Sequence, residues 1–510
     1  MTKDVDLTLT PEEAFDEAVI LKKASGKCGI PSSRATGFRI LRKSIDARRV
    51  DVKINLKVRI FVGEKVAPSF VPTVFPDVSS SPSVVVVGAG PAGLFAALTL
   101  IENNLRPIVL ERGKDVHERK KDCAALCREG ILDPDSNYVY GEGGAGAYSD
   151  GKLYTRSVKR GDVAKVLSLF VQHGADDSIL YEVHPHVGTD RLPGVIENMR
   201  NTIISSGGEV HFSTLVESLV IEKGEVKGVK TRDGREFLGP VILATGHSAK
   251  DVYRFLDKEG IALEAKDTAV GVRLEHPQIL IDQIQYHSSK GRGKYLPPAT
   301  YSFVTQVEGR GVYSFCMCPG GSVVPSASEE GMLSVNGMSS SSRSGSKANA
   351  AMVVQIRQSD IPGKGVFSML DWVEEIERRS FCPLYQAPAQ RMADFVQDKF
   401  SSTLPSSTYA PGLVSKRMDE VLPPLVSSSL RLGFKAFDHM TRGKFLTNEA
   451  VMVGSETRTS SPVRILRDEG YMSIPGLYPA GEGAGYAGGI VSAAIDGTEC
   501  AKMVAQKYRR

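Results

Sequence analysis

The chain has 510 residues, of which 41% are hydrophobic and 24% charged, as in an ordinary globular protein. Its 63 Lys and Arg against 59 Asp and Glu leave a net charge of +4, too balanced to indicate nucleic-acid or membrane-surface binding. About two to four packed units are expected, because a single core rarely grows beyond about 250–300 residues.

The cysteine content and the amino terminus indicate a reducing compartment. The seven Cys residues are an odd number without regular spacing, which is typical of free thiols rather than of a disulfide framework. Acidic residues come early, at Asp4, Asp6 and Glu12, where a secretory signal needs a basic start and a transit peptide lacks acids. We therefore predict a protein of the cytoplasm or the plastid stroma, with no targeting segment visible in the sequence.

One uncharged stretch has the length of a membrane span but not its continuity. Residues 84–101 carry no charge. Gly88, Gly90, Pro91 and Gly93 interrupt them, and glycine and proline in series favour a turn over a continuous helix. The sequence predicts no membrane span and no nucleic-acid partner, and it leaves the oligomeric state open.

Residues 1–70 are predicted to form a small α/β domain. Thr10-Pro11-Glu12-Glu13 has the form of a capping box with proline at the first helical position, and an apolar helical stripe follows to Leu21. Residues 39–62 contain the alternation typical of a half-buried strand. A run rich in Pro and Ser then predicts a linker at residues 71–80.

The rest of the chain has an α/β pattern that is interrupted once. Short apolar strands alternate with helices up to about residue 265, the middle mixes strands and helices, and the α/β pattern returns near the end. We predict a Rossmann-like, three-layer βαβ domain formed by residues 81–265 and 446–510. Residues 266–445 are predicted to be an α+β substrate or cap domain inserted into it.

The strongest functional motif is a dinucleotide fingerprint at the start of that domain. The apolar strand Val84–Val87 leads into Gly88, Gly90 and Gly93, and Glu111 ends the next strand 18 residues later. Gly88 permits the tight turn, Gly90 lets the backbone approach a pyrophosphate, and Gly93 permits close helix packing. The amides of the helix N-terminus would face the phosphates, and Glu111 would accept hydrogen bonds from a ribose.

Three further segments favour FAD over NAD as the dinucleotide. Residues 111–113, Glu-Arg-Gly, have the form of this strand end in glutathione-reductase-type flavoproteins. Residues 239–246 resemble the second motif of those proteins, and residues 476–483 resemble the last motif. In that motif the acidic residue, here Glu482, binds the ribityl or pyrophosphate part. The glycine-rich turn at 485–490 would open a helix whose amides face the flavin ring.

Two other GxGxxG strings lack the strand and helix that the fingerprint needs. Residues 483–488 are followed by one helix and no strand, and residues 141–146 by Ser149, Asp150 and Gly151 instead of an apolar helix. No second nucleotide-binding unit is predicted, so NAD(P)H would reach the flavin transiently.

These motifs extend into a resemblance to a known family. Residues 141–153, 315–321, 456–464 and 478–492 resemble segments of the uncharacterised FAD-dependent dehydrogenases of bacteria and plastid-bearing organisms. The resemblance implies non-covalent FAD in a glutathione-reductase-type fold and names no substrate. The residues predicted to bind FAD are Gly88, Gly90, Pro91, Ala92, Gly93, Glu111, Arg112, Gly143, Gly144, Gly146, Ala244, Thr245, Gly246, Gly481, Glu482, Gly488, Gly489 and Ile490.

Catalytic side chains are less evident, and no metal site is predicted. His276 is a candidate general acid, against the alternative of a structural histidine. Arg343 and Arg458 are candidates for binding an anionic substrate, against the alternative of solvated side chains. Cys316 and Cys318, two apart on a strand, would point to one face, where structural thiols are favoured over a redox pair.

The sequence thus predicts an FAD-dependent oxidoreductase acting on a small molecule. The predicted reaction, as a dehydrogenase or reductase, is hydride transfer between flavin N5 and a small organic substrate. Two alternatives remain open: a flavin monooxygenase or oxidase, and a non-catalytic flavin-binding sensor or interaction protein.

Overall fold

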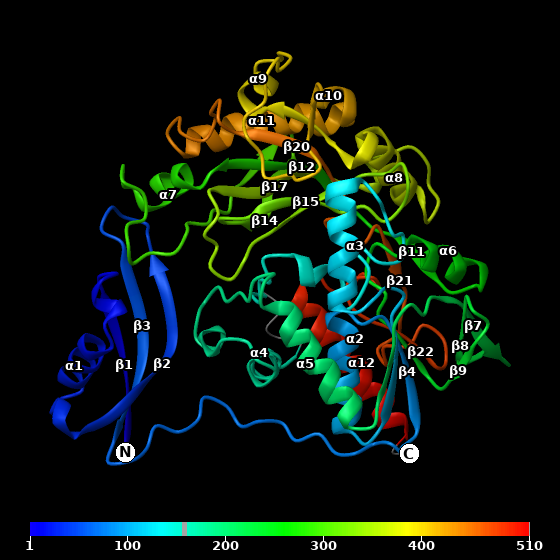
Figure 1. Ribbon diagram of the computed structural model, residues 1–510, viewed down its shortest axis with the longest axis horizontal. Coiled ribbons are helices and arrows are strands. Elements are labelled where there is room, and N and C mark those ends of the chain that lie inside the picture. Colours follow the sequence, from blue (N-terminus) through cyan, green and yellow to red (C-terminus); the bar gives the residue numbers. More distant parts are fainter. Residues whose placement is uncertain (156–160, 509–510) are drawn as a thin grey trace.

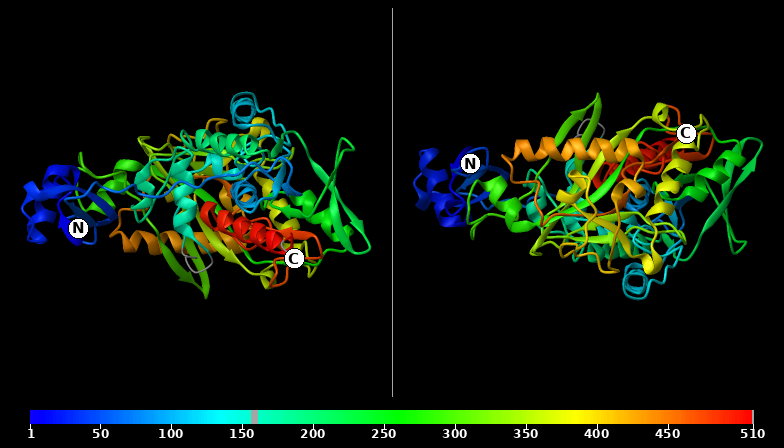
Figure 2. Two further views of the ribbon diagram at one scale, coloured as in Figure 1. Left: turned by 90° about the horizontal axis from the view of Figure 1, so that it is seen from below. Right: turned by 90° about the horizontal axis from the view of Figure 1, so that it is seen from above.

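The computed structural model describes residues 1–155 and 161–508, and the chain folds around three main sheets. A three-stranded sheet lies at the amino-terminal end, a five-stranded sheet lies near the carboxyl terminus, and a seven-stranded sheet lies above both in Figure 1. The molecule is elongated, with the amino-terminal sheet at one end (Figure 2). The two ends of the chain both lie along the lower edge of the molecule in Figure 1.

The amino-terminal unit is an antiparallel sheet with one helix packed on it. The sheet has the order β1-β3-β2, and its elements are β1 (Thr2–Leu9), α1 (Glu17–Lys27), β2 (Ala35–Asp46) and β3 (Lys53–Val62). The single strand predicted from the alternation is therefore a hairpin. An extended segment without regular structure, rich in proline, connects the unit to the rest of the chain (Figure 1).

The predicted capping box is present, but it does not start the helix. The backbone amide of Thr10 donates to the Glu13 carboxylate at 3.1 Å, and the amide of Glu13 donates to the Thr10 hydroxyl at 3.2 Å. These bonds close a single turn. The helix itself begins after Asp16, whose carboxylate accepts a hydrogen bond from the amide of Ala18 at 2.9 Å.

The five-stranded sheet is parallel, as the fingerprint requires. Its order is β22-β10-β4-β5-β6, and the strands are β4 (Ser83–Val87), β5 (Arg106–Leu110), β6 (Glu209–His211), β10 (Val241–Leu243) and β22 (Leu477–Pro479). The helices of this part are α2 (Pro91–Glu102), α3 (Val116–Glu129), α4 (Val163–Gln172), α5 (Leu192–Ser205), α6 (Lys250–Lys258) and α12 (Ile490–Tyr508). A parallel sheet between helices is consistent with a Rossmann-like fold.

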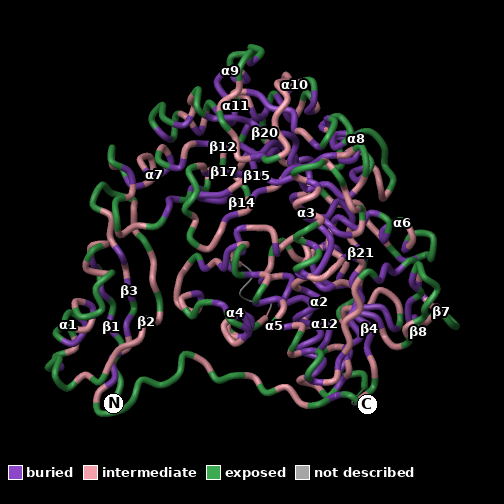
Figure 3. Tube along the Cα trace, viewed as in Figure 1, coloured by how far each residue is buried: buried purple, intermediate pink, exposed green. Residues whose placement is uncertain are grey.

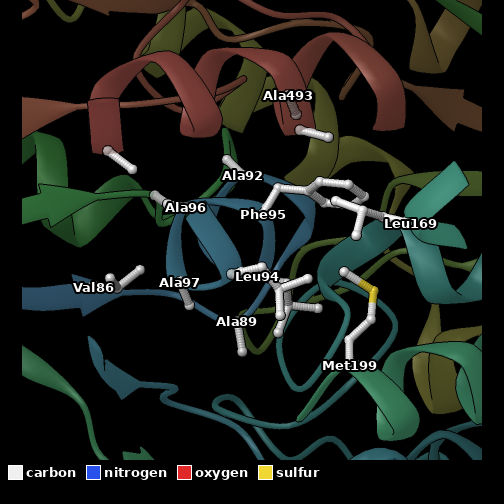
Figure 4. Packing of buried hydrophobic residues seen from close by; sticks show 14 of the residues in the cluster. Val86, Ala89, Ala92, Leu94, Phe95, Ala96, Ala97, Leu169, Met199 and Ala493 are labelled. Atoms are coloured by element: carbon white, nitrogen blue, oxygen red, sulfur yellow. The ribbon is translucent and has the colours of Figure 1, made fainter. Parts of the chain in front are cut away.

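The two faces of this sheet belong to two different hydrophobic clusters. Val84 and Val86 point to the face that carries α2, α12 and α5, where Phe95 and Ala493 meet (Figure 4). Val85 and Val87 point to the other face, covered by α6 and by the antiparallel meander β7 (Val216–Glu222), β8 (Glu225–Thr231) and β9 (Glu236–Leu238). This alternation produces three layers and leaves the strands buried on both sides (Figure 3).

The seven-stranded sheet is built from one continuous stretch of the chain. Its order is β13-β14-β17-β12-β20-β18-β19, and its strands are β12 (Thr268–Pro277), β13 (Val304–Val307), β14 (Arg310–Cys318), β17 (Lys347–Ile356), β18 (Ala387–Arg391), β19 (Leu413–Ser415) and β20 (Val451–Glu456). A hairpin of β15 (Ser322–Pro325) and β16 (Val335–Met338) lies beside it. Its helices are α7 (Gln278–Tyr286), α8 (Ser368–Ser380), α9 (Met392–Val396), α10 (Met418–Val421) and α11 (Pro424–Met440).

The chain leaves the parallel sheet once and returns to it once. The departing segment β11 (Leu263–Ala265) pairs antiparallel with the returning segment β21 (Val463–Ile465). The two sheets are thereby held at a fixed junction, and the loops at the carboxyl ends of the parallel strands face the seven-stranded sheet. No helix of residues 1–155 and 161–508 is both long and apolar enough to cross a membrane.

Candidate active site

A cavity of about 360 Å³ lies between the parallel sheet and the seven-stranded sheet. One wall, which we call the glycine wall, consists of residues 88–93, 143–146, 244–248 and 480–490. All but 143–146 follow the carboxyl ends of parallel strands, where open α/β sheets bind ligands. The opposite wall, which we call the polar wall, consists of Cys316, Asn336, Glu456 and Arg458. A smaller cavity of about 40 Å³ adjoins the large one.

The turn between β4 and α2 has no room for a side chain at Gly88 or at Gly93. Gly88 has a φ of +106°, and a Cβ there would lie 2.4 Å from the carbonyl oxygen of Ala244. A Cβ on Gly93 would lie 1.8 Å from the carbonyl oxygen of Gly88. Gly90 faces the large cavity, and a Cβ on it would have the Cα of Gly144 as its nearest neighbour, at 3.8 Å. These glycines therefore keep backbone, rather than side chains, at the cavity surface.

Glu111 joins the β4–α2 turn to two neighbouring segments of the chain. Its carboxylate, 5% exposed, accepts hydrogen bonds from the amides of Ala89 (2.8 Å), Gly113 (2.9 Å) and Gly141 (3.1 Å). Glu111 also lines the smaller cavity. Because a carboxylate offers about four acceptor positions, one remains for a ligand hydroxyl.

Residues 137–144 are held in place by Arg119, which was not predicted from the sequence as a site residue. Arg119 is fully buried and donates hydrogen bonds to the carbonyl oxygens of Asn137, Glu142 and Gly144, at 2.8, 2.7 and 2.8 Å. The amide of Gly143 donates to the carbonyl of Ala89 at 2.8 Å. A buried guanidinium thus fixes this loop against the β4–α2 turn.

The carboxyl-terminal turn closes the glycine wall. Gly481 has a φ of +77°, and its amide donates to the Asp496 carboxylate at 2.7 Å. Asp496 is paired with Arg467 at 2.6 Å. Gly488 and Gly489 line the cavity, and a Cβ on either of them would have no atom within 4 Å. The open space beside them leads to the first residues of α12.

The residues predicted to bind FAD fall into three sets. Those that line the large cavity are Gly90, Pro91, Ala92, Gly144, Gly146, Ala244, Thr245, Gly246, Glu482, Gly488, Gly489 and Ile490. Gly88, Glu111 and Arg112 line the smaller cavity. Gly93, Gly143 and Gly481 line neither of the two, and they shape the backbone of the turns instead.

A buried arginine organises the polar wall. Arg273 on β12 is fully buried and donates to the carbonyl oxygen of Cys316 at 2.8 Å and to the Asn336 amide oxygen at 2.6 Å. Its Nε lies 3.0 Å from the Glu456 carboxylate. Burial, only partly offset by the Arg273 cation, raises the pKa of Glu456 to about 8. Glu456 is therefore a protonated carboxylic acid at neutral pH, and it lines the cavity.

Cys316 and Cys318 do not form the regular pair that their spacing predicts. A bulge interrupts the pairing of β14 with β17 between Phe315 and Cys318, and Cys316 has a φ of +44°. Cys316 lines the cavity, whereas Cys318 is fully buried behind it. The structure thus corrects the expectation of two equivalent thiols buried on one face of a strand.

His276 and Arg343, the catalytic candidates, do not line the cavity. His276 is fully buried in β12, its Nε2 lies 2.9 Å from the carbonyl oxygen of Phe445, and burial lowers its pKa to about 4. It is a neutral core side chain, which does not support a role as general acid. Arg343 is paired through its Nε with Asp150 at 2.9 Å, and Asp150, fully buried, does line the cavity.

Arg458 lines the cavity but is already paired. Its Nε and Nη2 contact the two carboxylate oxygens of Glu377 at 3.0 and 3.1 Å, and its Nη1 donates to Ser328 at 2.9 Å. Burial opposes the ionisation of Glu377, but the Arg458 and Lys250 cations outweigh it and lower its pKa to about 2. The guanidinium is therefore committed within the protein, which does not support the predicted anion-binding role.

His247 is a cavity residue that the sequence analysis missed. Its Nδ1 lies 3.6 Å from the Glu482 carboxylate, and within the described part of the chain its buried Nε2 has no hydrogen-bond partner. An unpaired polar atom at a cavity is a place where a polar ligand group fits. The signal was its position directly after the Thr245-Gly246 motif. Across the described ranges, no three His, Cys, Asp or Glu side chains gather as a metal site.

Three segments of the chain match known protein families. Residues 83–120 match an FAD binding domain, and residues 267–459 match the C-terminal domain-like part of an FAD-dependent protein. Residues 1–61 match a domain of unknown function. The first two matches cover the β4–α2 turn of the glycine wall and the residues of the polar wall.

The chain is also similar to individual proteins. An uncharacterized protein of Clostridium beijerinckii is 39% identical over 518 residues, covering 97% of each chain. A 4,4'-diapophytoene desaturase (4,4'-diapolycopene-forming) of Methylomonas sp is 37% identical over 60 residues, which is 12% of this chain and 11% of that one. A geranylgeranyl bacteriochlorophyll reductase-like protein of Thermoplasma acidophilum is 14% identical, with a TM-score of 0.36, covering 84% of this chain and 79% of that one.

The similarity to the Clostridium beijerinckii protein extends over nearly the whole chain, through both sheets that enclose the cavity. A short or distant similarity, like the other two, does not establish a shared activity. The chain belongs to the same family as the Clostridium beijerinckii protein. Its own two matched segments make it an FAD-dependent oxidoreductase, and its cofactor is FAD.

Proposed function

We propose that the protein is a dehydrogenase or reductase that transfers a hydride between FAD and a small organic substrate bound at the polar wall. The observation that carries the proposal is the continuous space along the glycine wall. It passes Gly90 and opens beside Gly488 and Gly489, where a Cβ would have no atom within 4 Å. This space supports a dinucleotide cofactor lying along backbone amides.

The proposed cofactor position assigns a task to each end of the cavity. The smaller cavity, with Glu111 as hydrogen-bond acceptor, would hold the adenosine part. The amides at the start of α2 would bind the pyrophosphate, and the first turn of α12 would face the flavin ring. The linker 71–80 and the ranges 81–265, 266–445 and 446–510 remain our proposed division of the chain. In this division β20 belongs to the last range, although it pairs with β12 and β18 in the seven-stranded sheet.

Bound FAD supplies the two-electron chemistry, so the chain has to orient the substrate and handle a proton. Glu456 suits the second task, because a carboxylic acid with a pKa of about 8 holds its proton at neutral pH and can still release it. Phe315 and Tyr154 line the cavity and are 36% and 50% exposed, which provides aromatic surface for an organic substrate.

The test begins with the purified protein, which should be yellow and release FAD, not FMN, on denaturation. The flavin is then reduced anaerobically, and candidate organic acceptors are mixed with it while the flavin absorbance is followed. Saturable reoxidation by an organic acceptor supports the proposal. Reoxidation by oxygen alone, with stoichiometric peroxide, would instead identify an oxidase or monooxygenase.

A further inference from the structure

Cys316 and Cys318 lie beside the large cavity, where the Cys316 thiol can react with a bound molecule. Cys316 is at the surface of the large cavity, across from the glycine wall, and Cys318 is directly behind it in the protein interior. The Cys318 sulfur donates to the Cys316 carbonyl oxygen at 3.4 Å.

The backbone at Cys316 is held in a conformation that a side chain rarely adopts. Its φ of +44° lies in the left-handed region, and the bulge in β14 produces it. The hydrogen bond from Arg273 to the Cys316 carbonyl fixes this conformation. The bulge turns Cys316 toward the cavity while leaving Cys318 within reach of it.

Charged groups around the pair favour a thiolate at the cavity. The Cys318 hydrogen bond, followed by the Lys152 and Arg273 cations, holds the pKa of the Cys316 thiol well below its usual value. Burial and the neighbouring Cys316 raise the pKa of Cys318. The anion nearby, Asp150, is engaged with Lys152 at 3.1 Å, and the protonated Glu456 adds no negative charge beside Cys316. One nucleophilic sulfur and one protonated sulfur are thus adjacent.

We propose that Cys316 and Cys318 are a redox-active pair that exchanges two electrons with the bound flavin. The inference rests on the proposed position of FAD along the glycine wall. In the exchange, the Cys316 thiolate and the Cys318 thiol would form one S–S bond, Cys318 would release its one proton, and bound oxidised flavin would accept the two electrons and that proton. The reverse reaction breaks the S–S bond and reoxidises the flavin. The substrate class is therefore a dithiol or disulfide, with Cys316 as the sulfur that meets it.

A second pair of cysteines lacks both the position at the cavity and the lowered thiol pKa. Cys123 and Cys127 lie one turn apart on α3, but neither lines the large cavity. Burial raises the pKa of Cys123 to about 12, and it also raises that of Cys127. These thiols stay protonated, which makes them the matched control for the pair at the cavity.

The first experiment counts the electrons that the FAD-loaded protein takes up. The protein is oxidised with a small-molecule disulfide, separated from it, and titrated anaerobically with dithionite. We expect about four electrons per flavin for the wild type, two for flavin and two for the disulfide, and about two for Cys316→Ser and for Cys318→Ser. The double variant Cys123→Ser with Cys127→Ser should keep about four. Uptake of only about two electrons by the FAD-loaded wild type would show that Cys316 and Cys318 are not a redox pair.

The second experiment needs no variant and tests the exchange itself. Reduced wild-type protein is mixed anaerobically with the same small-molecule disulfide, and the flavin should be reoxidised at least about tenfold faster than free reduced FAD. Alkylation under denaturing conditions and mass spectrometry should find Cys316 and Cys318 blocked after oxidation and labelled after reduction. Labelling in both states overturns the proposal, with the proposed hydride transfer untouched. A wild type that holds no FAD overturns the proposed cofactor position, and the thiol proposal with it.

Discussion

The two walls of the large cavity differ in what they present to a ligand. The glycine wall presents backbone, because a Cβ at Gly88 or Gly93 would collide with neighbouring carbonyl oxygens. The polar wall presents side chains, and a buried arginine, Arg273, connects its Cys316, Asn336 and Glu456. The first wall suits a cofactor that many proteins share, whereas the second suits a particular reaction.

A glycine substitution should have the largest effect, because it acts on the turn where the glycine wall presents backbone. Gly90→Val is expected to fill the space along the β4–α2 turn and to abolish copurification of FAD. The matched control is Gly194→Val on α5, where a Cβ would have no atom within 4 Å. Flavin content per protein, measured by absorbance after denaturation, decides the outcome. Full occupancy in Gly90→Val would show that the cofactor does not pass this turn.

Replacing Arg273, the centre of the polar wall, should lower the free energy of unfolding and leave the FAD content unchanged. Arg273→Met leaves the Glu456 carboxyl and the Cys316 carbonyl without their partner in the interior, and we expect a loss of about 3–5 kcal/mol in the free energy of unfolding. Arg232→Met, at an exposed ion pair with Glu217, should lose at most about 1 kcal/mol. Chemical denaturation measures the free energy of unfolding of both variants. Equal losses would show that the buried Arg273 contributes no more to stability than the surface ion pair of Arg232.

Glu456→Gln should change the pH dependence of the polar wall. The pKa of Glu456 is raised to about 8 in the folded protein, so the wild-type carboxyl binds a proton that the unfolded chain has lost. Wild-type stability should therefore fall as pH rises from about 4.3 through about 8, and that of Glu456→Gln should fall less. Reoxidation that needs the protonated acid should also slow above pH 8 in the wild type. Parallel pH profiles of the two proteins would argue against a titrating Glu456.

The two walls also differ in how far the sequence could predict them. The β4–α2 turn is local, so strand, glycines, helix and terminal acid could all be read from 28 consecutive residues, 84–111. The polar wall depends on strand order, since β12, β14 and β20 bring Arg273, Cys316 and Glu456 together from distant positions. A spacing of two residues predicted one face for Cys316 and Cys318, but a bulge with a left-handed residue cannot be read from spacing. The predicted start of α1 was also wrong, because the helix begins after Asp16, which the sequence analysis did not identify as its cap.

NAD(P)H should reduce the flavin only slowly, because the chain has no second turn whose backbone amides would bind the NAD(P)H pyrophosphate in the described residues. The GxGxxG string at 483–488 leads directly into α12, which runs to Tyr508, with no strand after it in the described part of the chain. The string at 141–146 is held by Arg119 against the β4–α2 turn. We expect anaerobic NADH or NADPH to reduce the flavin slowly, without saturation at micromolar concentrations. Stopped-flow absorbance measures this, and fast saturating reduction would reveal a pyridine-nucleotide site.

The smallest effect on catalysis is expected at His276, which lies behind the polar wall and not in it. Its ring contacts Phe445 with centroids 4.4 Å apart, and its Nε2 reaches a backbone carbonyl rather than the cavity. His276→Gln, which retains a hydrogen-bond donor, should leave flavin content and the rate of flavin reoxidation within about twofold of wild type. It should lower the free energy of unfolding by about 1–3 kcal/mol, because a buried hydrogen bond is distorted. The comparison variant is His247→Gln, whose ring lines the cavity beside Glu482 and whose loss should slow reoxidation. If His276→Gln slows the reaction more than His247→Gln does, the polar wall extends deeper than the cavity surface, and a neutral core histidine acts on the chemistry through its neighbours.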